Sequence, residues 1–599
     1  MAWYDEAVFY HIYPLGLTGA PKQNDYGEPV HRLNTLLPWV DHIKEIGGSA
    51  LYIGPLFESV GHGYETTDYK KLDSRLGTNE DLTAFVAYCH EQGIKVIFDG
   101  VFNHTGRDFF AFKDIQANRE NSQYKDWYCN VNFWGNNEYN DGFSYDNWGG
   151  YNLLVKLNQK NPAVVDYICD VIRFWVSEFD VDGIRLDAAD VLDFDFMKAL
   201  RRTANEVKPD FWLMGEVIHG DYSRWVNGET LHSVTNYTLH KALYSGHNDH
   251  NYFEIAHTVR RLQNMGTLKL YNFVDNHDVE RIYTKLTNKA HFAPVHVLLY
   301  TLPGVPSIYY GSEFGIEGRK EYGSDDSLRP ALNIEDYKDS VKTNPCTALI
   351  AALGKVRQAV PALSYGSYDE LMLTNRQFAY ARDLDGTRVI VSVNNDDAPA
   401  GMHLAAGNCT AYIGALSGEK VSVQDGHINI TQPANSGEIW VPEGTDLDVK
   451  PVKVVTKTES EAKTNTEDKA ASETATDAKG NKEADPKIES KESKDIVTAT
   501  ESADAKKNTT NTEKNISAAN EVKDSAKDAS AQAAADTPVD PETITVDWSK
   551  SPESMTVPEL QAAILAKLAG NGPVDAQMKK TVTDNIWHDS LVNWLKSFR

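Results

Sequence analysis

KVIFDGVFNHTG, residues 95–106, is an apolar run followed at once by an aspartate, an asparagine and a histidine. Three later stretches share this design: GIRLDAADV at 183–191, GEVIHG at 215–220 and FVDNHD at 273–278. Each belongs to an apolar, strand-like run and delivers carboxylates or a histidine where that run ends. The pattern predicts a single carboxylate-rich site that is assembled from the ends of separate strands.

Short apolar runs alternate with amphipathic stretches from about residue 8 to residue 313. The strand candidates are VFYHIYPLG, ALYIGPLFE, KVIFDGVFNH, GIRLDA, WLMGEV, HSVTNY, LYNFVDNHD and SIYYGSE. Helix-like segments lie between them, at 34–47, 79–93, 161–179 and 193–207 among others. Eightfold alternation of strand and helix predicts an α/β fold in which a parallel sheet closes into a (β/α)₈ barrel, a TIM barrel. In that fold the carboxyl ends of the strands line the active site.

The connection after the third strand is too long for a simple loop. Loops of such length are usually functional, so we expect residues 105–159 to form an inserted subdomain between barrel segments 1–104 and 160–363. Most aromatic residues of this insert are expected to form a small core, and one or two could face the substrate groove. These residues are Trp127, Tyr128, Phe133, Trp134, Tyr139, Tyr145, Trp148 and Tyr151.

The composition and hydrophobic pattern of the C-terminal part of the chain change twice. Residues 364–448 alternate apolar and polar positions and predict an antiparallel β-domain. Residues 449–543 contain no aromatic residue and predict a disordered linker, because they cannot bury enough apolar area to offset ordering entropy. Residues 544–599 predict a small helical module with amphipathic helices at 557–570 and 584–598.

The helical module has two interpretations. It either folds on itself or back onto the enzyme, or it docks to a protein partner or self-associates. The residues that would form its internal core or its docking face are Trp587, Leu591, Trp594, Leu595 and Phe598.

Composition narrows the classes of partner and the compartment. The net charge of −27 disfavours nucleic acid and anionic membranes. The first residues, MAWYDEAVFYHIYPLG, lack a basic segment followed by an apolar one, and no apolar stretch is long enough to span a bilayer. Five scattered cysteines without metal-binding spacing suit free thiols in a reducing compartment. We therefore expect a cytoplasmic protein.

The strand-end carboxylates differ in their surroundings. Arg185 and Asp187 are two residues apart on one strand and face the same side, so Arg185 is expected to keep Asp187 ionised and oriented, as a nucleophile requires. Glu216 follows the apolar WLMG, where burial favours the protonated form that an acid/base needs. A lone Asp at a strand end is more often a helix cap. Four such stretches in order are harder to explain by capping.

Together the four stretches resemble the signature regions of the α-amylase family of glycoside hydrolases, over about residues 8–445. The resemblance implies that Asp187 is the nucleophile, Glu216 the general acid/base and Asp278 the transition-state stabiliser. It also implies a structural carboxylate, Asp99, and a group of residues around the sugar that is cleaved. This group comprises Tyr64, His104, Arg185 and His277.

Finer similarities point to neopullulanases, cyclomaltodextrinases and maltogenic amylases, which the LVKLN stretch at 154–158 resembles. In those enzymes an Asp and an Arg after the eighth strand bind the glucose next to the cleaved one, and Asp325 and Arg329 in SDDSLRP match them. Asn103 matches a calcium ligand of many α-amylases, although an Asn at a strand end more often hydrogen-bonds backbone. The resemblance thus indicates no required cofactor and leaves calcium as a candidate.

We expect retaining hydrolysis of α-1,4-glucosidic bonds in maltodextrins or cyclodextrins through a covalent glycosyl-enzyme. An α-glucanotransferase is the alternative within enzymes, because water or a sugar hydroxyl can attack the same intermediate. A non-catalytic carbohydrate-binding or scaffolding barrel is the alternative from another class. The presence of all three carboxylates disfavours that last alternative.

Overall fold

A computed structural model describes residues 2–449 except 267, 322, 323 and 448, and, nearer the C-terminus, residues 546, 548, 550–552, 555–569, 582 and 595. Apart from Val449, the predicted linker at 449–543 lies outside the described residues. So does most of the predicted helix at 584–598, including Trp587, Leu591, Trp594 and Phe598. Two compact units divide the chain at about residue 498, and each is described by itself.

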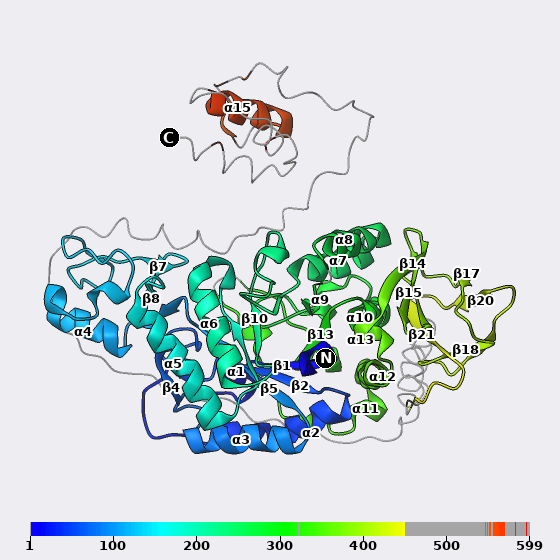
Figure 1. Ribbon diagram of the computed structural model, residues 1–599, viewed down its shortest axis with the longest axis horizontal. Helices are drawn as coiled ribbons and strands as arrows, with labels where there is room; N and C mark the ends of the chain where they lie inside the picture. The colour runs from blue at the N-terminus through cyan, green and yellow to red at the C-terminus, as the bar shows by residue number, and fades with distance from the viewer. Residues whose placement is uncertain are drawn as a thin grey trace, which may run out of the picture. The chain divides into compact units, whose positions relative to one another are not determined.

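The first unit is built on a parallel barrel, as predicted from the alternation (Figure 1). The sheet order is β11-β10-β9-β5-β2-β1-β13-β12, and a parallel bridge between Thr235 and Tyr271 joins β12 back to β11. All eight strand candidates contribute in chain order. Their bounds are β1 Phe9–Ile12, β2 Ala50–Ile53, β5 Lys95–Gly100, β9 Gly183–Leu186, β10 Trp212–Gly215, β11 Ser233–Val234, β12 Tyr271–Asn272 and β13 Val305–Tyr309.

Helices surround these strands and bury the outer face of the barrel. The longer ones are α2 Leu37–Glu45, α3 Asn79–Glu91, α5 Pro162–Phe179, α6 Phe194–Val207, α7 Tyr237–Asn248, α8 Tyr252–Asn264, α10 Phe292–Thr301 and α12 Pro345–Ala359. Shorter elements are α1 Pro14–Leu17, β3 Phe57–Ser59, β4 Thr66–Leu72, α9 Ile282–Lys285, α11 Ser340–Thr343 and α13 Ala362–Tyr365. Among the described helices, none combines the length and the apolar character needed to cross a lipid bilayer.

Helix α5 shows how local sequence sets these elements. The Asn161 side chain accepts a hydrogen bond from the amide of Ala163, and Pro162 occupies the first turn, where its missing N–H costs nothing. The helix ends at Asp180, whose φ of 54° lies in the left-handed region. Its apolar stripe buries Trp175, which stacks on Phe57 with ring centroids 4.4 Å apart. Capping and stripe together place the helix against the strands that carry the site.

Residues 105–159 hold α4 Phe110–Asn118, β7 Asn147–Trp148 and β8 Tyr151–Lys156. Strand β6, His104–Thr105, pairs antiparallel with β8, so the insert is attached directly to the end of the third barrel strand. Phe112 packs on the rings of Tyr128, Phe143 and Tyr145, and all four belong to the apolar core that is continuous with the barrel. Most of the insert's aromatic residues are thus buried or partly buried, and four are exposed: Phe110, Trp134, Tyr139 and Tyr151.

The predicted antiparallel β-domain follows the barrel. A six-stranded sheet has the order β14-β15-β16-β21-β18-β19, and β17 pairs with β20. The bounds are β14 Ser367–Leu373, β15 Gln377–Leu384, β16 Thr387–Asn394, β17 Ala400–Ala405, β18 Ala411–Gly414, β19 Lys420–Ser422, β20 His427–Gln432 and β21 Ser436–Pro442. Arg382, buried beside the barrel, donates to the carbonyl of Thr301 at 2.6 Å and so joins β15 to α10.

The second unit contains one described helix, α15 Val557–Ala569, which matches the predicted helix at 557–570. Leu560 and Ile564 on this helix pack with Val582 and Leu595 in a small apolar cluster. Leu595, which the sequence left between core and docking face, belongs to this core and is only 6% exposed.

Candidate active site

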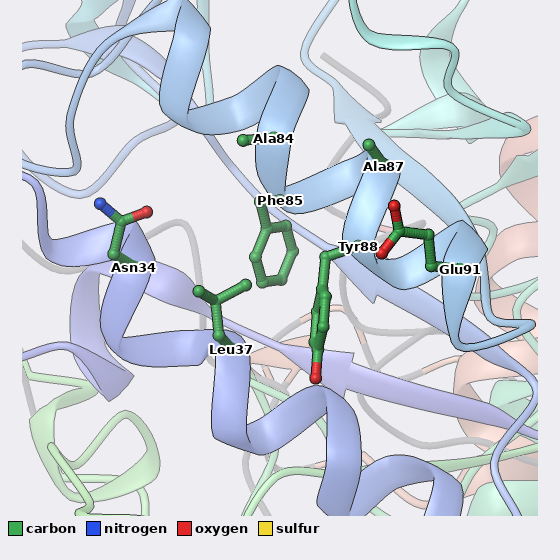
Figure 2. Close-up of a pocket in the computed structure, with 7 residues that line it drawn as sticks. All are labelled: Asn34, Leu37, Ala84, Phe85, Ala87, Tyr88 and Glu91. Carbon is green, nitrogen blue, oxygen red and sulfur yellow. The ribbon is translucent and has the colours of Figure 1, made fainter.

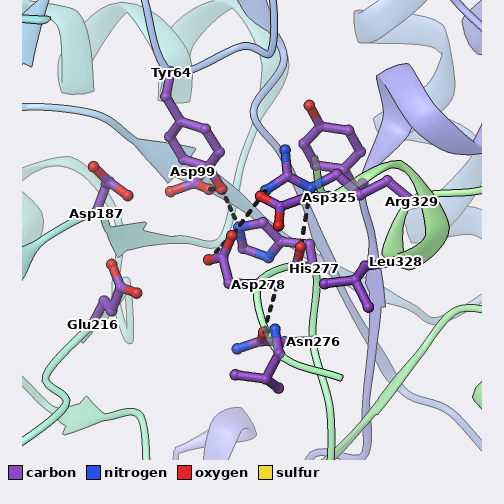
Figure 3. Close-up of polar contacts among 12 residues, drawn as sticks. Tyr64, Asp99, Asp187, Glu216, Asn276, His277, Asp278, Asp325, Leu328 and Arg329 are labelled. Atoms are coloured by element: carbon purple, nitrogen blue, oxygen red, sulfur yellow. Dashed lines mark hydrogen bonds and ion pairs between the residues drawn. The ribbon is translucent and has the colours of Figure 1, made fainter. Parts of the chain in front are cut away.

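The predicted carboxylates meet at the carboxyl ends of four barrel strands. The register pairs Asp99 of β5 with Arg185 of β9, and Arg185 with Met214 of β10. Asp187 and Glu216 directly follow β9 and β10, and their amides donate to Gly100 and Leu186 at 3.1 and 2.9 Å. Asp278 follows β12, and Figure 3 shows its carboxylate together with those of Asp187, Glu216 and Asp99. The barrel thus brings the predicted residues together.

Arg185 is the centre of this cluster. Its side chain is only 4% exposed, and its guanidinium contacts three carboxylates. Nη1 lies 2.8 Å from Asp99 Oδ1 and 2.9 Å from Asp187 Oδ1, while Nη2 lies 2.8 Å from Glu216 Oε2. A planar guanidinium has enough N–H groups in a fixed fork to serve all three at once. Arg185 therefore fixes the spacing of the cluster.

Asp99 is the innermost carboxylate and is held on both oxygens. Tyr52 and Tyr64 donate to Oδ2 at 2.8 and 3.2 Å, and Arg185 reaches both oxygens. Because Asp99 is buried and bonded on every side, it can orient Arg185 and Tyr64 but cannot reach a bound sugar. This arrangement suits the structural part that the resemblance implies.

Asp187 and Glu216 each have one oxygen held and one oxygen open. Arg185 binds Oδ1 of Asp187, and Oε2 of Glu216 accepts from Arg185 and from the amide of Ala188 at 3.0 Å. Oδ2 of Asp187 and Oε1 of Glu216 accept no hydrogen bond from any described residue. The two side chains are 12% and 15% exposed, so their open oxygens remain available to a ligand.

Burial raises the pKa of Asp187 well above its usual range, and Arg185 opposes this shift. The negative charges of Glu216, Asp99 and Asp278 raise it further. This direction is opposite to the one expected from the pairing of Asp187 with Arg185 alone. The reason is that burial is the largest influence on this carboxyl and that three neighbouring carboxylates add to it, so the single positive charge of Arg185 does not reverse the shift. A proton taken up here belongs to the cluster and not to a single isolated group.

Asp278 has the opposite tendency. Burial would raise its pKa, but His277, and after it Arg329 and Arg185, outweigh burial and hold the pKa well below its usual range. His277 Nε2 lies 3.0 Å from Oδ2, and Arg329 Nη2 lies 2.9 Å from Oδ1. Asp278 is therefore ionised at neutral pH and adds a negative charge to the cluster.

The residues around the cluster are tied to one another. The hydroxyl of Tyr64 makes a short hydrogen bond with His277 Nε2, and the two rings stack with centroids 5.7 Å apart. His104 Nε2 lies 3.1 Å from the carbonyl of Tyr64, and burial lowers the pKa of His104 to about 3, so this imidazole is neutral. Buried His104 supports Tyr64 from behind.

Arg329 joins Asp278 to Asp325. Its Nη2 lies 3.0 Å from Asp325 Oδ2, and its Nε donates to the carbonyl of His277 at 3.0 Å. The two residues assigned from SDDSLRP thus lie beside Asp278, with Asp325 partly exposed. Sequence reasoning missed Lys320, which donates to the carbonyl of Asp278 at 2.9 Å, because it lies 42 positions away in a stretch without periodicity. It also missed Tyr52, whose inward position follows from the alternation along β2.

Asn103, the candidate calcium ligand, has both side-chain polar atoms engaged with neighbouring residues. It is fully buried, its Oδ1 accepts from Gln159 Nε2 at 3.4 Å, and its Nδ2 lies 3.3 Å from His104 Nδ1. Calcium takes six to eight oxygens, and no group of three or more His, Cys, Asp or Glu side chains in the described part of the chain could hold a metal ion. Asn103 is here a hydrogen-bonding residue at the strand end.

A pocket on the outside of the barrel is separate from this cluster. It lies between α2 and α3, where Leu37, Phe85 and Tyr88 line it together with Asn34 and Glu91 (Figure 2). The Tyr88 hydroxyl donates to Asp41 at 2.8 Å. None of the strand-end carboxylates reaches this pocket, which is part of the helix packing.

Comparison with known proteins agrees with the geometry. The family profile described as "Alpha amylase, catalytic domain" matches residues 32–355. A cyclomaltodextrinase from Bacillus sp is 31% identical over 66% of this chain and 74% of its own length, and one from Thermoanaerobacter pseudethanolicus is 32% identical over 66% and 71%. A solved cyclomaltodextrinase structure superposes with a TM-score of 0.65 at 26% identity, covering 73% of this chain and 78% of that one. With its barrel, its strand-end carboxylates and these matches, the chain belongs to the α-amylase family of glycoside hydrolases.

Proposed function

We propose that this glycoside hydrolase cleaves α-1,4-glucosidic bonds in maltodextrins and cyclodextrins with retention of configuration. The observation that carries the proposal is the shared guanidinium of Arg185, which binds one oxygen each of Asp187 and Glu216 and leaves the other oxygens open. Two carboxyl groups held close together across a glycosidic bond are the requirement of the retaining mechanism. Cyclomaltodextrinases among the relatives support the choice of substrate.

In the first step Glu216 donates its proton to the glycosidic oxygen, and Oδ2 of Asp187 attacks the anomeric carbon as the bond to the leaving sugar breaks. In the second step the Glu216 carboxylate takes a proton from water, and the water oxygen displaces Asp187 from the anomeric carbon. Asp278 remains ionised and offsets the positive charge of the sugar ring in both transition states.

The raised pKa of Asp187 has a consequence for this sequence. The cluster binds a proton readily, and catalysis needs that proton on Glu216 and not on Asp187. We infer that substrate binding favours this arrangement, because the glycosidic oxygen accepts a hydrogen bond from protonated Glu216 and the ring's developing charge favours ionised Asp187. Arg185 contacts both residues and stabilises either location of the negative charge.

The surrounding residues bind the sugar. The ring of Tyr64 stacks on the sugar that is cleaved. His277 and Arg185 lie close to the hydroxyls of that sugar. His104 takes part through Tyr64. Asp325 and Arg329 bind the next glucose, a role supported by the partial exposure of Asp325 and its contact with Arg329 beside Asp278. Free glucose hydroxyls need such donors and acceptors, which the cluster supplies.

The test is product analysis on maltotriose, β-cyclodextrin, starch and pullulan, with the anomeric form of the first product followed by proton NMR. Retention gives the α-anomer first. Shorter products alone indicate hydrolysis, whereas longer products indicate transfer to sugar acceptors. Asp187→Asn should abolish cleavage while the circular dichroism spectrum stays unchanged. Near-original turnover of maltotriose by that variant contradicts the assignment.

We further propose that the segment 446–599 is separable from catalysis. The support is that α15 packs Leu560 and Ile564 with Leu595 in a cluster of its own. This segment then serves docking to a partner or self-association. Deleting 446–599 should leave turnover of maltotriose unchanged and alter the number of chains per particle in light scattering or the recovery of a bound partner. Loss of turnover contradicts the separation.

We also propose that the protein is located in the cytoplasm. The support is that all five cysteines are free thiols, and that burial raises the pKa of Cys89 to about 12 and of Cys346 to about 11. Such unreactive thiols persist in a reducing compartment. Cell fractionation with a cytoplasmic marker enzyme tests it, and recovery in the medium contradicts it.

A further inference from the structure

The most exposed large aromatic residue in the described part of the chain lies in the insert. Trp134 is 98% exposed, and Tyr139 on the same loop is 46% exposed. Burying an indole of this size against a ligand is worth several times more than burying an aliphatic methyl group. A tryptophan that packs on nothing contributes no stability to the fold, so its presence asks for another explanation.

The loop that carries these rings is rigid. Asn132 and Ser144 exchange two backbone hydrogen bonds at 2.8 and 3.0 Å, and the amide of Trp134 donates to Asn132 Oδ1 at 3.0 Å. Arg119 donates to the carbonyls of Asp141 and Gly142 at 3.0 and 2.9 Å. Because the backbone is fixed on both sides, binding a ligand on Trp134 requires ordering of its side chain but little ordering of the loop.

Tyr139 has one face covered and one face open. The guanidinium of Arg107 lies 3.8 Å from the ring centre, and a bidentate ion pair at 2.7 and 2.8 Å fixes Arg107 to Asp141. A cation on one face holds the ring in place by cation–π attraction. The other face accounts for the exposure of Tyr139 and is flat, apolar and preorganised.

The side chains around the two rings are amides and a carboxylate. Asn132, Asn136, Glu138 and Asn140 are exposed on this loop. A protein interface is depleted in charged groups such as the Glu138 carboxylate at its centre, whereas a sugar presents an apolar ring face for stacking and hydroxyls for amides and carboxylates. An anionic ligand is disfavoured by the net charge of −27.

The insert also connects this loop to the cleavage site. His104, behind Tyr64, pairs with Lys156 at one end of β8, and Tyr151 begins the other end, five residues away. That separation is roughly 17 Å along the strand. Asn152, next to Tyr151, hydrogen-bonds with Glu138, next to Tyr139. A glucan several units long can therefore lie from the carboxylates along the insert, which Figure 1 shows at one edge of the barrel around α4, β7 and β8.

We propose that the loop 132–142 is a second glucan-binding surface, on which Trp134 and Tyr139 stack against glucose units of a long α-glucan whose cleaved bond lies at the carboxylates. This rests on the proposed function for the substrate class. The surface raises affinity for polymers and leaves short oligosaccharides unaffected, because maltotriose fills the cluster without reaching the loop.

The experiment compares Trp134→Ala with Phe253→Ala, which removes another solvent-facing ring, 46% exposed, from helix α8 outside the insert. Retention in native gels that contain amylopectin is measured in an Asp187→Asn background, so that the polymer stays intact. Turnover of amylopectin and maltotriose is measured without that background. Trp134→Ala is the decisive variant, because a side chain with no packing cannot unfold the protein when removed.

We expect Trp134→Ala to weaken retention on amylopectin about fivefold and to raise KM for amylopectin by a similar factor. KM and kcat for maltotriose should stay within about twofold, and Phe253→Ala should match the parent throughout. A gel containing a β-1,4-glucan should retain neither protein. Unchanged retention of Trp134→Ala overturns the proposal, as does a change in molar mass without a change in retention, which marks a protein interface. Absence of maltotriose cleavage by the parent overturns the proposed function alone.

Discussion

Replacing Arg185 by lysine separates the effect of its charge from that of its geometry. The guanidinium touches Asp99, Asp187 and Glu216 at 2.8–2.9 Å and is almost fully buried. A lysine ammonium keeps the charge but is a compact point on a flexible stem, so it can reach one of the three carboxylates well. We therefore expect the variant to lose the contacts to two carboxylates.

The size of the effect follows from these two contacts. A hydrogen bond to a charged group contributes about 1.5–3 kcal/mol, so two of them amount to about 3–6 kcal/mol. If that energy acts in the transition state, kcat/KM falls by about 10²- to 10⁴-fold, at 1.36 kcal/mol for each factor of ten. The assay is kcat/KM on maltotriose, with circular dichroism to confirm that the variant is folded.

The matched control is Arg173→Lys. Arg173 makes a bidentate pair with Glu206 at 3.0 and 3.0 Å, but both side chains are largely exposed, at 42% and 58%. An exposed pair of this kind contributes at most about 1 kcal/mol to stability and does not touch the site. Retention of kcat/KM within about threefold by Arg185→Lys would refute the reasoning, because charge alone would then suffice.

Three further predictions follow from named contacts. Asp187→Asn should stabilise the protein more at about pH 8 than at about pH 4, as measured by urea unfolding. Burial raises the pKa of Asp187, so the native carboxyl favours folding at low pH and loses that contribution as the pH rises through its folded pKa. Asn has no charge to bury, so its effect on folding does not change with pH. Tyr64→Phe should lower kcat/KM on maltotriose about tenfold, because it removes the hydroxyl shared by Asp99 and His277; an unchanged value would contradict its part in the site. Asn161→Ala should cost about 1 kcal/mol of unfolding free energy through the lost cap of α5, with kcat unchanged.

The barrel could be predicted because its signal is local. Most of the eight strands lie in apolar runs of a few residues. The start of α5 is marked by Asn161 and Pro162, and its length is marked by its apolar stripe. The closure between β11 and β12 could not be predicted in this way. It depends on a single bridge between Thr235 and Tyr271, two short strands that pair across 36 positions. Register between distant segments leaves no mark in local periodicity.

The candidate site could be predicted where its residues lie at strand ends, but not where they come from loops. Asp99, Asp187, Glu216 and Asp278 could be located because strand ends converge at one edge of a barrel. Their partners from irregular segments were predictable only through resemblance, as for Arg329, or not at all, as for Lys320. Those contacts arise where loops after different strands meet, and the composition of a loop does not state which neighbour it will touch.

The pKa of Asp187 is raised, although the position of Arg185 two residues earlier in the sequence predicts that it is lowered. Two residues of spacing on β9 make Arg185 look like a partner for Asp187 alone. In the folded chain, β5 and β10 bring Asp99 and Glu216 to the same guanidinium, so one positive charge faces three negative ones. Arg185 consequently does not decide which carboxylate is ionised. It decides which oxygens are held, and by holding Oδ1 of Asp187 and Oε2 of Glu216 it leaves the opposite oxygens as the pair that can meet a glycosidic bond.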